Sequence, residues 1–253
     1  MMQKKSKRKL LSLLLCLLLS AALLSGCGGG DSETGQGGSD ANDRGIPEIA
    51  GLTYEKSVTF DYARCLAIDQ YEGGYSLVDV FDDAKYLVVP EGGSVPKDLD
   101  DSIQIIQLPL QHIYLGATAV MSLFDAIDAL DHVSMTALKE SGWTVENAAK
   151  RMREGKLVYA GKYNTPDYEL ILAQGCELAI ESTMIYHTPD VKEMLEELGV
   201  PVLVDRSSYE SNPLGRTEWI KLYGVLTGKE EAANAFFEKQ KESVAELENY
   251  SST

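Results

Sequence analysis

Histidine and cysteine are scarce in this sequence, which has three histidines and four cysteines among 253 residues. His112, His132 and His187 lie in three separate segments, and no two of them share a metal-ligand spacing. Carriers of bare zinc or manganese gather several histidines and carboxylates around the ion, so this class is disfavoured. In the body of the chain, Cys65 and Cys176 each lie beside an apolar run. A disulfide and two buried free thiols are both compatible with that placement.

Basic residues are also few. The chain has 23 Lys and Arg against 39 Asp and Glu, which gives a formal net charge of −16. Five of the cations lie in residues 4–9 of an apparent export signal, so the exported body has a charge near −21. Phosphate binding needs clustered Lys and Arg, and a nucleic-acid partner is therefore not expected.

Catalytic signatures are missing as well. The sequence contains no Gly-x-Ser-x-Gly elbow, no His-Glu-x-x-His motif and no phosphate-binding glycine loop. The acid pairs Asp82-Asp83 and Asp100-Asp101 lie in predicted loops, with no apolar pocket to raise a carboxyl pKa. The sequence predicts neither an enzyme nor a bound cofactor.

The longest apolar run, residues 10–24, is too short for a membrane span, which needs about 20 apolar residues. A basic segment precedes it and Leu24-Ser-Gly-Cys27 closes it, which is typical of a secretory signal. The closing motif resembles the bacterial lipobox, whose cysteine becomes the lipidated mature N-terminus. We therefore expect a signal peptide over residues 1–26, lipidation (palmitate) at Cys27 and a flexible polar tether over residues 27–45. The expected location is the extracytoplasmic face of the cell membrane.

Residues 46–110 are predicted to be rich in β-structure. Strand-like runs at residues 54–60, 64–70, 75–81 and 84–89 are separated by Gly73-Gly74 and Asp82-Asp83. This spacing predicts an antiparallel meander. A loop over residues 90–101 leads to a further strand from residue 103.

Residues 111–213 alternate between short apolar runs and amphipathic helical patterns. Strands are expected near residues 112, 131, 157, 178 and 201. Helices are expected at residues 119–130, 145–153, 167–174 and 189–198. Their predicted buried stripes comprise Val120, Leu123, Phe124, Ile127 and Leu130 in the first, Tyr168, Ile171 and Leu172 in the third, and Val191, Met194, Leu195 and Leu198 in the fourth. The alternation predicts an α/β fold with a parallel, doubly wound sheet.

Polar and aromatic residues follow the predicted strands. Because crossovers are right-handed, these residues should gather at one edge of the sheet, where open α/β sheets bind ligands. Aromatic and hydroxyl groups there suit a bulky, partly aromatic ligand. The candidate ligand-binding residues are Tyr114, Thr118, Met135, Lys162, Tyr163, Asn164, Thr183, Met184, Tyr186, Arg206, Ser208 and Tyr209.

Residues 214–253 are predicted to be helical, with a break at residues 226–228 and a longer helix over residues 229–247. In the longer helix we expect protection near Ala233 and Phe237, and fraying from about Ser243, with Val244 and Leu247 exposed.

Several segments together resemble one protein family, the substrate-binding proteins of ABC importers for iron–siderophore complexes, haem and cobalamin. These segments are Ile113-Tyr-Leu-Gly-Ala-Thr118, residues 164–171, Glu177-Leu-Ala-Ile-Glu181, residues 198–204 and residues 223–232. In this family two α/β lobes are joined by a long rigid helix, and the ligand lies between them. The chain departs from the pattern in residues 175–178, where the family has a Pro-Asp pair. No second lobe follows the helix, so the chain is expected to be a fragment or truncated form and to bind its ligand poorly.

The resemblance implies four partners: a small ligand (ferric siderophore, haem or cobalamin), a permease, its ATPase and the membrane through the lipid anchor. It also implies that Glu169 contacts the permease, although an acid in the first turn of a helix is favourable in any case. Two alternatives stay open, namely a lipid-anchored structural module without a small ligand and a zinc or manganese binder.

Overall fold

The computed structural model describes residues 45–251, and the side chains of residues 45–247. The predicted signal peptide, Cys27 and nearly all of the predicted tether lie outside the described residues. None of the helices within residues 45–251 has the length and apolar character needed to cross a membrane.

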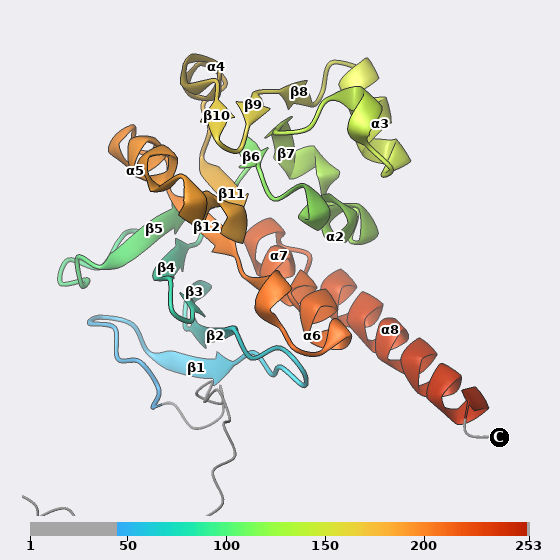
Figure 1. Cartoon of the computed structure of the whole chain (residues 1–253). Coiled ribbons are helices and arrows are strands. Elements are labelled where there is room, and N and C mark those ends of the chain that lie inside the picture. Colours follow the sequence, from blue (N-terminus) through green and yellow to red (C-terminus); the bar gives the residue numbers. More distant parts are fainter. Residues whose placement is uncertain (1–44, 252–253) are drawn as a thin grey trace, which may run out of the picture. The chain divides into compact units, whose positions relative to one another are not determined.

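The first sheet is formed by β1 to β5, which lie in chain order (Figure 1). The pairings from β1 to β4 are antiparallel, and β5 joins β4 in parallel. Gly73 and Gly74, both with positive φ, form the β2–β3 turn as the sequence indicated. The predicted meander is confirmed. Its strands are Tyr54–Ser57 (β1), Leu66–Tyr71 (β2), Tyr75–Val80 (β3), Ala84–Val89 (β4) and Ile103–Gln107 (β5).

The second sheet is entirely parallel, in the order β12-β11-β6-β7-β8. This confirms the predicted α/β fold and the five predicted strand positions. A short antiparallel pair, β9 (Gly161–Lys162) and β10 (Thr165–Pro166), follows β8 and was not predicted. The strands of the parallel sheet are Ile113–Leu115 (β6), Val133–Thr136 (β7), Val158–Tyr159 (β8), Leu178–Ser182 (β11) and Val202–Asp205 (β12).

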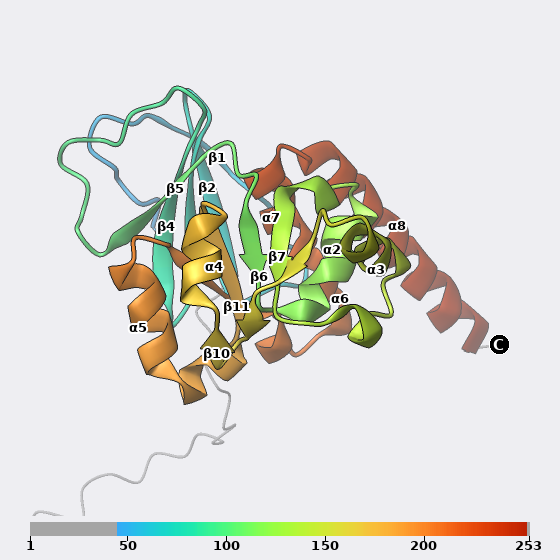
Figure 2. The ribbon, with the colours of Figure 1, turned by 90° about the horizontal axis from the view of Figure 1, so that it is seen from above.

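Helices cover both faces of the parallel sheet, as Figures 1 and 2 show. One face packs against α2 (Met121–Ala126) and α7 (Ile220–Thr227), and the other against α4 (Tyr168–Ala173) and α5 (Pro189–Glu197). Alternate strand residues therefore enter two different cores: Leu178 and Ile180 of β11 pack with the first pair of helices, and Ala179 packs with the second.

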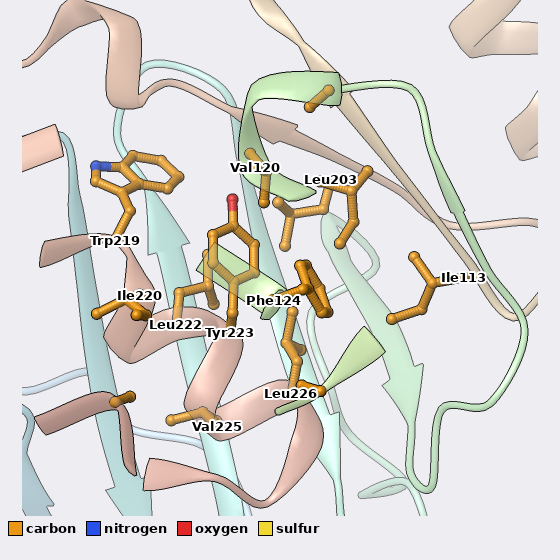
Figure 3. Close-up of a cluster of buried hydrophobic side chains, with 14 of the residues drawn as sticks. Ile113, Val120, Phe124, Leu203, Trp219, Ile220, Leu222, Tyr223, Val225 and Leu226 are labelled. Atoms are coloured by element: carbon orange, nitrogen blue, oxygen red, sulfur yellow. The ribbon is translucent and has the colours of Figure 1, made fainter. Parts of the chain in front are cut away.

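The α2/α7 core also includes the inner face of the first sheet. In Figure 3 the ring of Phe124 lies beside that of Tyr223, with centroids 5.0 Å apart. Ile68 and Val88 of the first sheet belong to the same buried cluster. The Tyr86 hydroxyl donates a hydrogen bond of 2.7 Å to the Val202 carbonyl and so ties the two sheets together.

Two buried carboxylates hold the segment between β1 and β2. Glu218, in α6 (Pro213–Glu218), accepts hydrogen bonds from the backbone N–H groups of residues 61, 62 and 63 at 2.8–2.9 Å. It also pairs with Lys221 at 2.7 Å. Glu210 accepts from the N–H groups of Arg64 and Cys65 and from the Trp219 indole. We call residues 59–65 the clasped segment.

Several helix predictions need correction. The helix expected over residues 119–130 is α2 alone, flanked by 3₁₀ turns at Thr118–Val120 and Leu130–His132. Asp128, with a φ of 54°, interrupts the α-helical path between them. Three side chains expected on buried stripes are instead exposed, because α4 and α5 bury only Ile171, Val191 and Leu195. The exposed side chains are Leu172, Met194 and Leu198.

The predicted helix over residues 145–153 is present as α3 (Glu146–Arg153). The break predicted at residues 226–228 is confirmed, since Gly228 adopts the left-handed conformation between α7 and α8 (Glu230–Ser251). Val244 is half-buried against the main core, contrary to expectation, whereas Leu247 is 70% exposed. The helix continues to Ser251, past the position where fraying was expected.

Candidate functional site

The strand order of the parallel sheet reverses between β6 and β11. From β6 the chain progresses through β7 to β8 on one side, and the later β11 and β12 lie on the other. Such a topological switch point leaves a crevice beyond the carboxyl ends of the strands, which is where open α/β sheets bind ligands.

A cavity of about 450 Å³ lies at this switch point and is lined by segments that follow all five strands of the sheet. Its volume is within the range of about 300–1,000 Å³ that is typical of small-molecule sites. Five of the predicted ligand-binding residues line it: Thr118, Lys162, Tyr163, Met184 and Ser208. Lys162 is its only lining cation among the described residues.

Other residues at the strand ends also line the cavity. Ser182 and Ser207 add hydroxyl groups, and Leu138 adds an apolar surface. Asp205 also lines the cavity, although its side chain is almost fully buried. Ser182 and Ser207 belong to the polar residues that follow the predicted strands. Leu138 and Asp205 share that position, since each of the four ends a strand of the parallel sheet or lies within two residues of its end.

Asp205 fixes one wall of the cavity. Its Oδ1 accepts hydrogen bonds from the Ser207 N–H (3.1 Å) and hydroxyl (2.5 Å), and its Oδ2 accepts one from the Tyr223 hydroxyl of α7. Burial raises the pKa of Asp205, while these donors act in the opposite direction. The turn after β12 is thereby fastened to the helix beneath it.

Two predicted ligand residues are in the core rather than at the cavity. Tyr114 and Met135 lie inside β6 and β7, and both are fully buried on the α4/α5 face of the sheet. Alternation along a strand sends them to that face instead of to the carboxyl edge. Asn164 is exposed in the β9–β10 turn, and the Thr183 hydroxyl lies 3.4 Å from that of Ser208 at the rim.

The remaining three predicted ligand residues form a cluster with the β3–β4 turn. The Tyr186 hydroxyl donates a 3.1 Å hydrogen bond to Asp83, and burial, first among several causes, raises the pKa of that tyrosine. Arg206 lies 3.6 Å from the Asp82 carboxylate and stacks over the Tyr209 ring at 4.9 Å. The Arg206 side chain is 12% exposed. Its positive charge therefore pairs with Asp82 of the first sheet and does not face a ligand in the cavity.

The turn after β6 lies against a buried acid. The Gly116 and Ala117 N–H groups both donate to the Ile180 carbonyl, at 2.8 and 2.9 Å. A Cβ atom on Gly116 would be 2.2 Å from Oε2 of Glu181, so a side chain at this position would collide with the carboxyl group. Glu181 is fully buried, and neither of its carboxyl oxygens has a hydrogen-bond partner. Its burial raises its pKa to about 8.

Glu169 is exposed in the first turn of α4, away from the cavity lining. The helix begins at Asp167, whose carboxylate accepts the Leu170 N–H at 3.0 Å. The capping function therefore belongs to Asp167. Within the part of the chain that the structure describes, the Glu169 side chain forms no hydrogen bond or ion pair.

The histidines and cysteines do not assemble into a site. Nowhere in residues 45–251 do three or more His, Cys, Asp or Glu side chains form a group that could hold a metal ion. Cys65 and Cys176 are free thiols, and burial raises the pKa of each to about 11. Thiols with raised pKa values are poor nucleophiles at neutral pH.

No family model matches the chain. A protein of Methanocaldococcus jannaschii, described as an uncharacterized lipoprotein, is 25% identical over 266 aligned residues that cover 96% of this chain. A periplasmic binding protein from Veillonella parvula aligns with 79% of the chain at a TM-score of 0.47 and 14% identity. The petrobactin-binding protein of Bacillus subtilis aligns with 54% of it at a TM-score of 0.43 and 12% identity.

The chain spans only part of each of these proteins. It covers 63% of the archaeal lipoprotein, 54% of the Veillonella protein and 45% of the Bacillus protein.

Proposed function

We propose that this protein is the lipid-anchored, extracytoplasmic solute-binding component of an ABC importer, and that its solute is an iron complex, either a ferric siderophore or haem. The observation that supports this most is the cavity of about 450 Å³ at the switch point of the parallel sheet. The resemblance of the strand and turn segments to the importer family supplies the class of protein.

The lining of the cavity suits an oxygen-rich ligand of negative charge. Thr118, Ser182 and Ser208 present hydroxyl groups, Lys162 presents a cation, and the exposed Met184 presents a soft apolar surface. Hydroxyl and ammonium groups can donate hydrogen bonds to the oxygen atoms of a ferric chelate.

A titration of intrinsic tryptophan fluorescence tests the solute-binding role. Four probes cover the ligand class: a ferric hydroxamate, a ferric catecholate, haemin and cyanocobalamin. In keeping with the poor binding expected of this chain, we expect one of the iron complexes to quench saturably but only weakly. Lys162→Ala should weaken that binding by a further factor of about ten, equivalent to about 1.4 kcal/mol. Lys156→Ala is the matched control, because Lys156 pairs with Glu154 outside the cavity lining. Saturable binding of cyanocobalamin alone would contradict the iron assignment. No quenching by any probe up to its solubility limit would contradict the function, and sub-micromolar binding would contradict the expected poor affinity.

The lipid anchor is assigned to Cys27, which lies outside the described residues. The lipobox-like Leu24-Ser-Gly-Cys27 and the lipoprotein description of the archaeal relative support it. Membrane fractionation of a Cys27→Ala form tests the assignment, because the variant should be released from the membrane. If it fractionates with membranes as firmly as the natural protein, the anchor lies elsewhere.

Permease docking is assigned to the α4/α5 side of the protein. Glu169 is exposed on α4, and the apolar side chains Leu172, Met194 and Leu198 are exposed on these two helices. A charged residue beside exposed apolar groups suits a reversible protein contact. Glu169→Arg should reduce ligand uptake by cells while the solute affinity of the purified protein stays unchanged. An equal loss of both would place Glu169 in folding or ligand binding instead.

A further inference from the structure

The Glu181 side chain is an anomaly in the core of this protein. It is 0% exposed, and both carboxyl oxygens lack a hydrogen-bond partner, as does the hydroxyl group of buried Tyr114. A buried carboxylate without a hydrogen-bond donor is strongly unfavourable, whereas its neutral form is tolerated. The carboxyl group therefore keeps its proton at neutral pH, consistent with a pKa of about 8.

No nearby group can compensate the charge if the proton leaves. The titratable groups that face Glu181 are Tyr114 of β6 and Tyr168 of α4, and Asp190 of α5 in turn faces Tyr168. Tyr159 and Cys176 face Tyr114. All of these are neutral or acidic, so none of the groups that face Glu181 beneath the closed turn can stabilise its ionised form.

Gly116 borders both the cavity at the switch point and the carboxyl group of Glu181. Gly116 lines that cavity, while the position of its missing Cβ lies 2.2 Å from Glu181 Oε2. The turn is closed by two hydrogen bonds to a single acceptor, the Ile180 carbonyl. Movement of residues 116–118 would therefore connect the carboxyl group to the solvent of the cavity.

We propose that Glu181 is a proton-controlled latch on the turn of residues 116–118. In its neutral form the side chain packs beneath the closed turn, and in its ionised form it favours the open turn, through which water reaches it. The latch is a property of the fold and needs no ligand. If the proposed function is correct, it also links solute binding in the cavity to extracellular pH.

The pH dependence follows from the two states of the turn. In the closed state the carboxyl has the raised pKa of about 8, and in the open, hydrated state it has the ordinary value of about 4.5. Opening therefore becomes more favourable by about tenfold for each unit of pH between these values, and it levels off above the higher one. At more acidic pH than the ordinary value, both states hold the proton and opening does not depend on pH.

Amide hydrogen exchange of the ligand-free protein between pH 5 and 8 tests the latch, after correction for the intrinsic pH dependence of exchange. Protection of the Gly116 and Ala117 amides should fall by about tenfold per pH unit in the natural protein and stay constant in Glu181→Gln. Glu193→Gln, which alters an exposed acid of α5, should behave like the natural protein.

Two outcomes would overturn the proposal. One is the same pH dependence in Glu181→Gln and the natural protein. The other is constant protection of both amides in the natural protein, which would mean that an internal water already solvates the carboxylate. The second outcome is decided without any variant, so the test holds even if Glu181→Gln does not fold. Neither outcome depends on a solute, and failure of the proposed function would leave this result unchanged.

Discussion

The carboxyl group of Glu181 has a higher pKa in the folded chain, about 8, than its ordinary value of 4.5. Below the ordinary value both the folded and the unfolded chain hold the proton, and the carboxyl group has no effect on the pH dependence of stability. As pH rises from there to about 8, the unfolded chain releases the proton and the folded chain does not. The free energy of unfolding therefore decreases across this window and levels off above it.

Glu181→Gln removes this titration and should remove the decrease. At 1.36 kcal/mol for each pKa unit, the natural protein should lose up to about 5 kcal/mol relative to the variant between pH 4.5 and 8. Urea denaturation at several pH values measures the difference, and only the change with pH matters, because the new amide has its own burial cost. Parallel stability curves for the two proteins would contradict a neutral Glu181.

The sequence could predict which residues line the cavity where those residues directly follow the end of a predicted strand. Thr118, Lys162 and Ser208 follow strands and line the cavity, as the sequence indicated. Tyr114 lies within a strand, where alternation decides its direction, and a three-residue strand gives too little pattern to read that alternation. Glu181 was not identified because only the packed structure shows that its carboxyl oxygens lack donors.

At the scale of elements, the clasped segment depends on buried carboxylates from distant helices. Glu218 satisfies three consecutive backbone N–H groups and the Lys221 ammonium. Glu218→Ala removes the acceptor of the three backbone N–H groups and the charge partner of the buried Lys221 ammonium, which keeps only the Thr59 carbonyl. We expect a loss of about 3–5 kcal/mol in the free energy of unfolding. Chemical denaturation is the measurement. Glu238→Ala is the control, because its pair with Lys241 is exposed and contributes less than about 1 kcal/mol.

An equal effect of Glu218→Ala and Glu238→Ala would contradict the clasp. The sequence could not predict this feature, since 155 residues separate Ala63 from Glu218. Helix and strand patterns report local periodicity, and they contain no information about which distant backbone groups a buried acid will meet.

The long helix α8 is anchored at one end. Phe237 is fully buried and packs edge-on against Tyr62 with ring centroids 6.2 Å apart, whereas Leu247 is exposed. We expect Phe237→Ala to lower the free energy of unfolding by about 3–5 kcal/mol. Leu247→Ala should change it by less than about 0.5 kcal/mol. Thermal or urea denaturation distinguishes the two variants, and a large loss for Leu247→Ala would show that the distal part of the helix is packed.

The predicted and observed ends of a helix agree where a glycine terminates the helix. Gly228 ends α7 as predicted, because a left-handed residue cannot continue the helix. The helix expected over residues 119–130 was wrong at both ends. Its apolar spacing is helical, but the chain leaves the α-helical path at Asp128, and hydrophobic periodicity does not register a single residue with positive φ.

At the scale of the whole molecule, residues 46–110 and 111–213 share one hydrophobic core. Ile68 and Val88 of the first sheet and Leu115 and Leu203 of the second belong to the same buried cluster. The sequence indicated an antiparallel β-segment followed by a segment of alternating strands and helices. The two sheets do differ in strand direction, because the first is mostly antiparallel and the second is parallel. Their common core follows from the inner face of the first sheet, which is apolar and needs a partner surface.

We infer that the carboxyl edge of the parallel sheet binds a small solute. The most direct test of this binding is a map of backbone amide NMR shifts while a ferric hydroxamate, a ferric catecholate (each as its diamagnetic gallium analogue) or gallium protoporphyrin is added. Binding at this edge should produce saturable shifts around the cavity, in residues 116–118, 162–163, 182–184 and 207–208. Shifts confined to other surfaces would contradict it, for example in the cavity lined by Ile46 and by Tyr71 and Ile103 of the first sheet. The absence of shifts with any probe would contradict it as well.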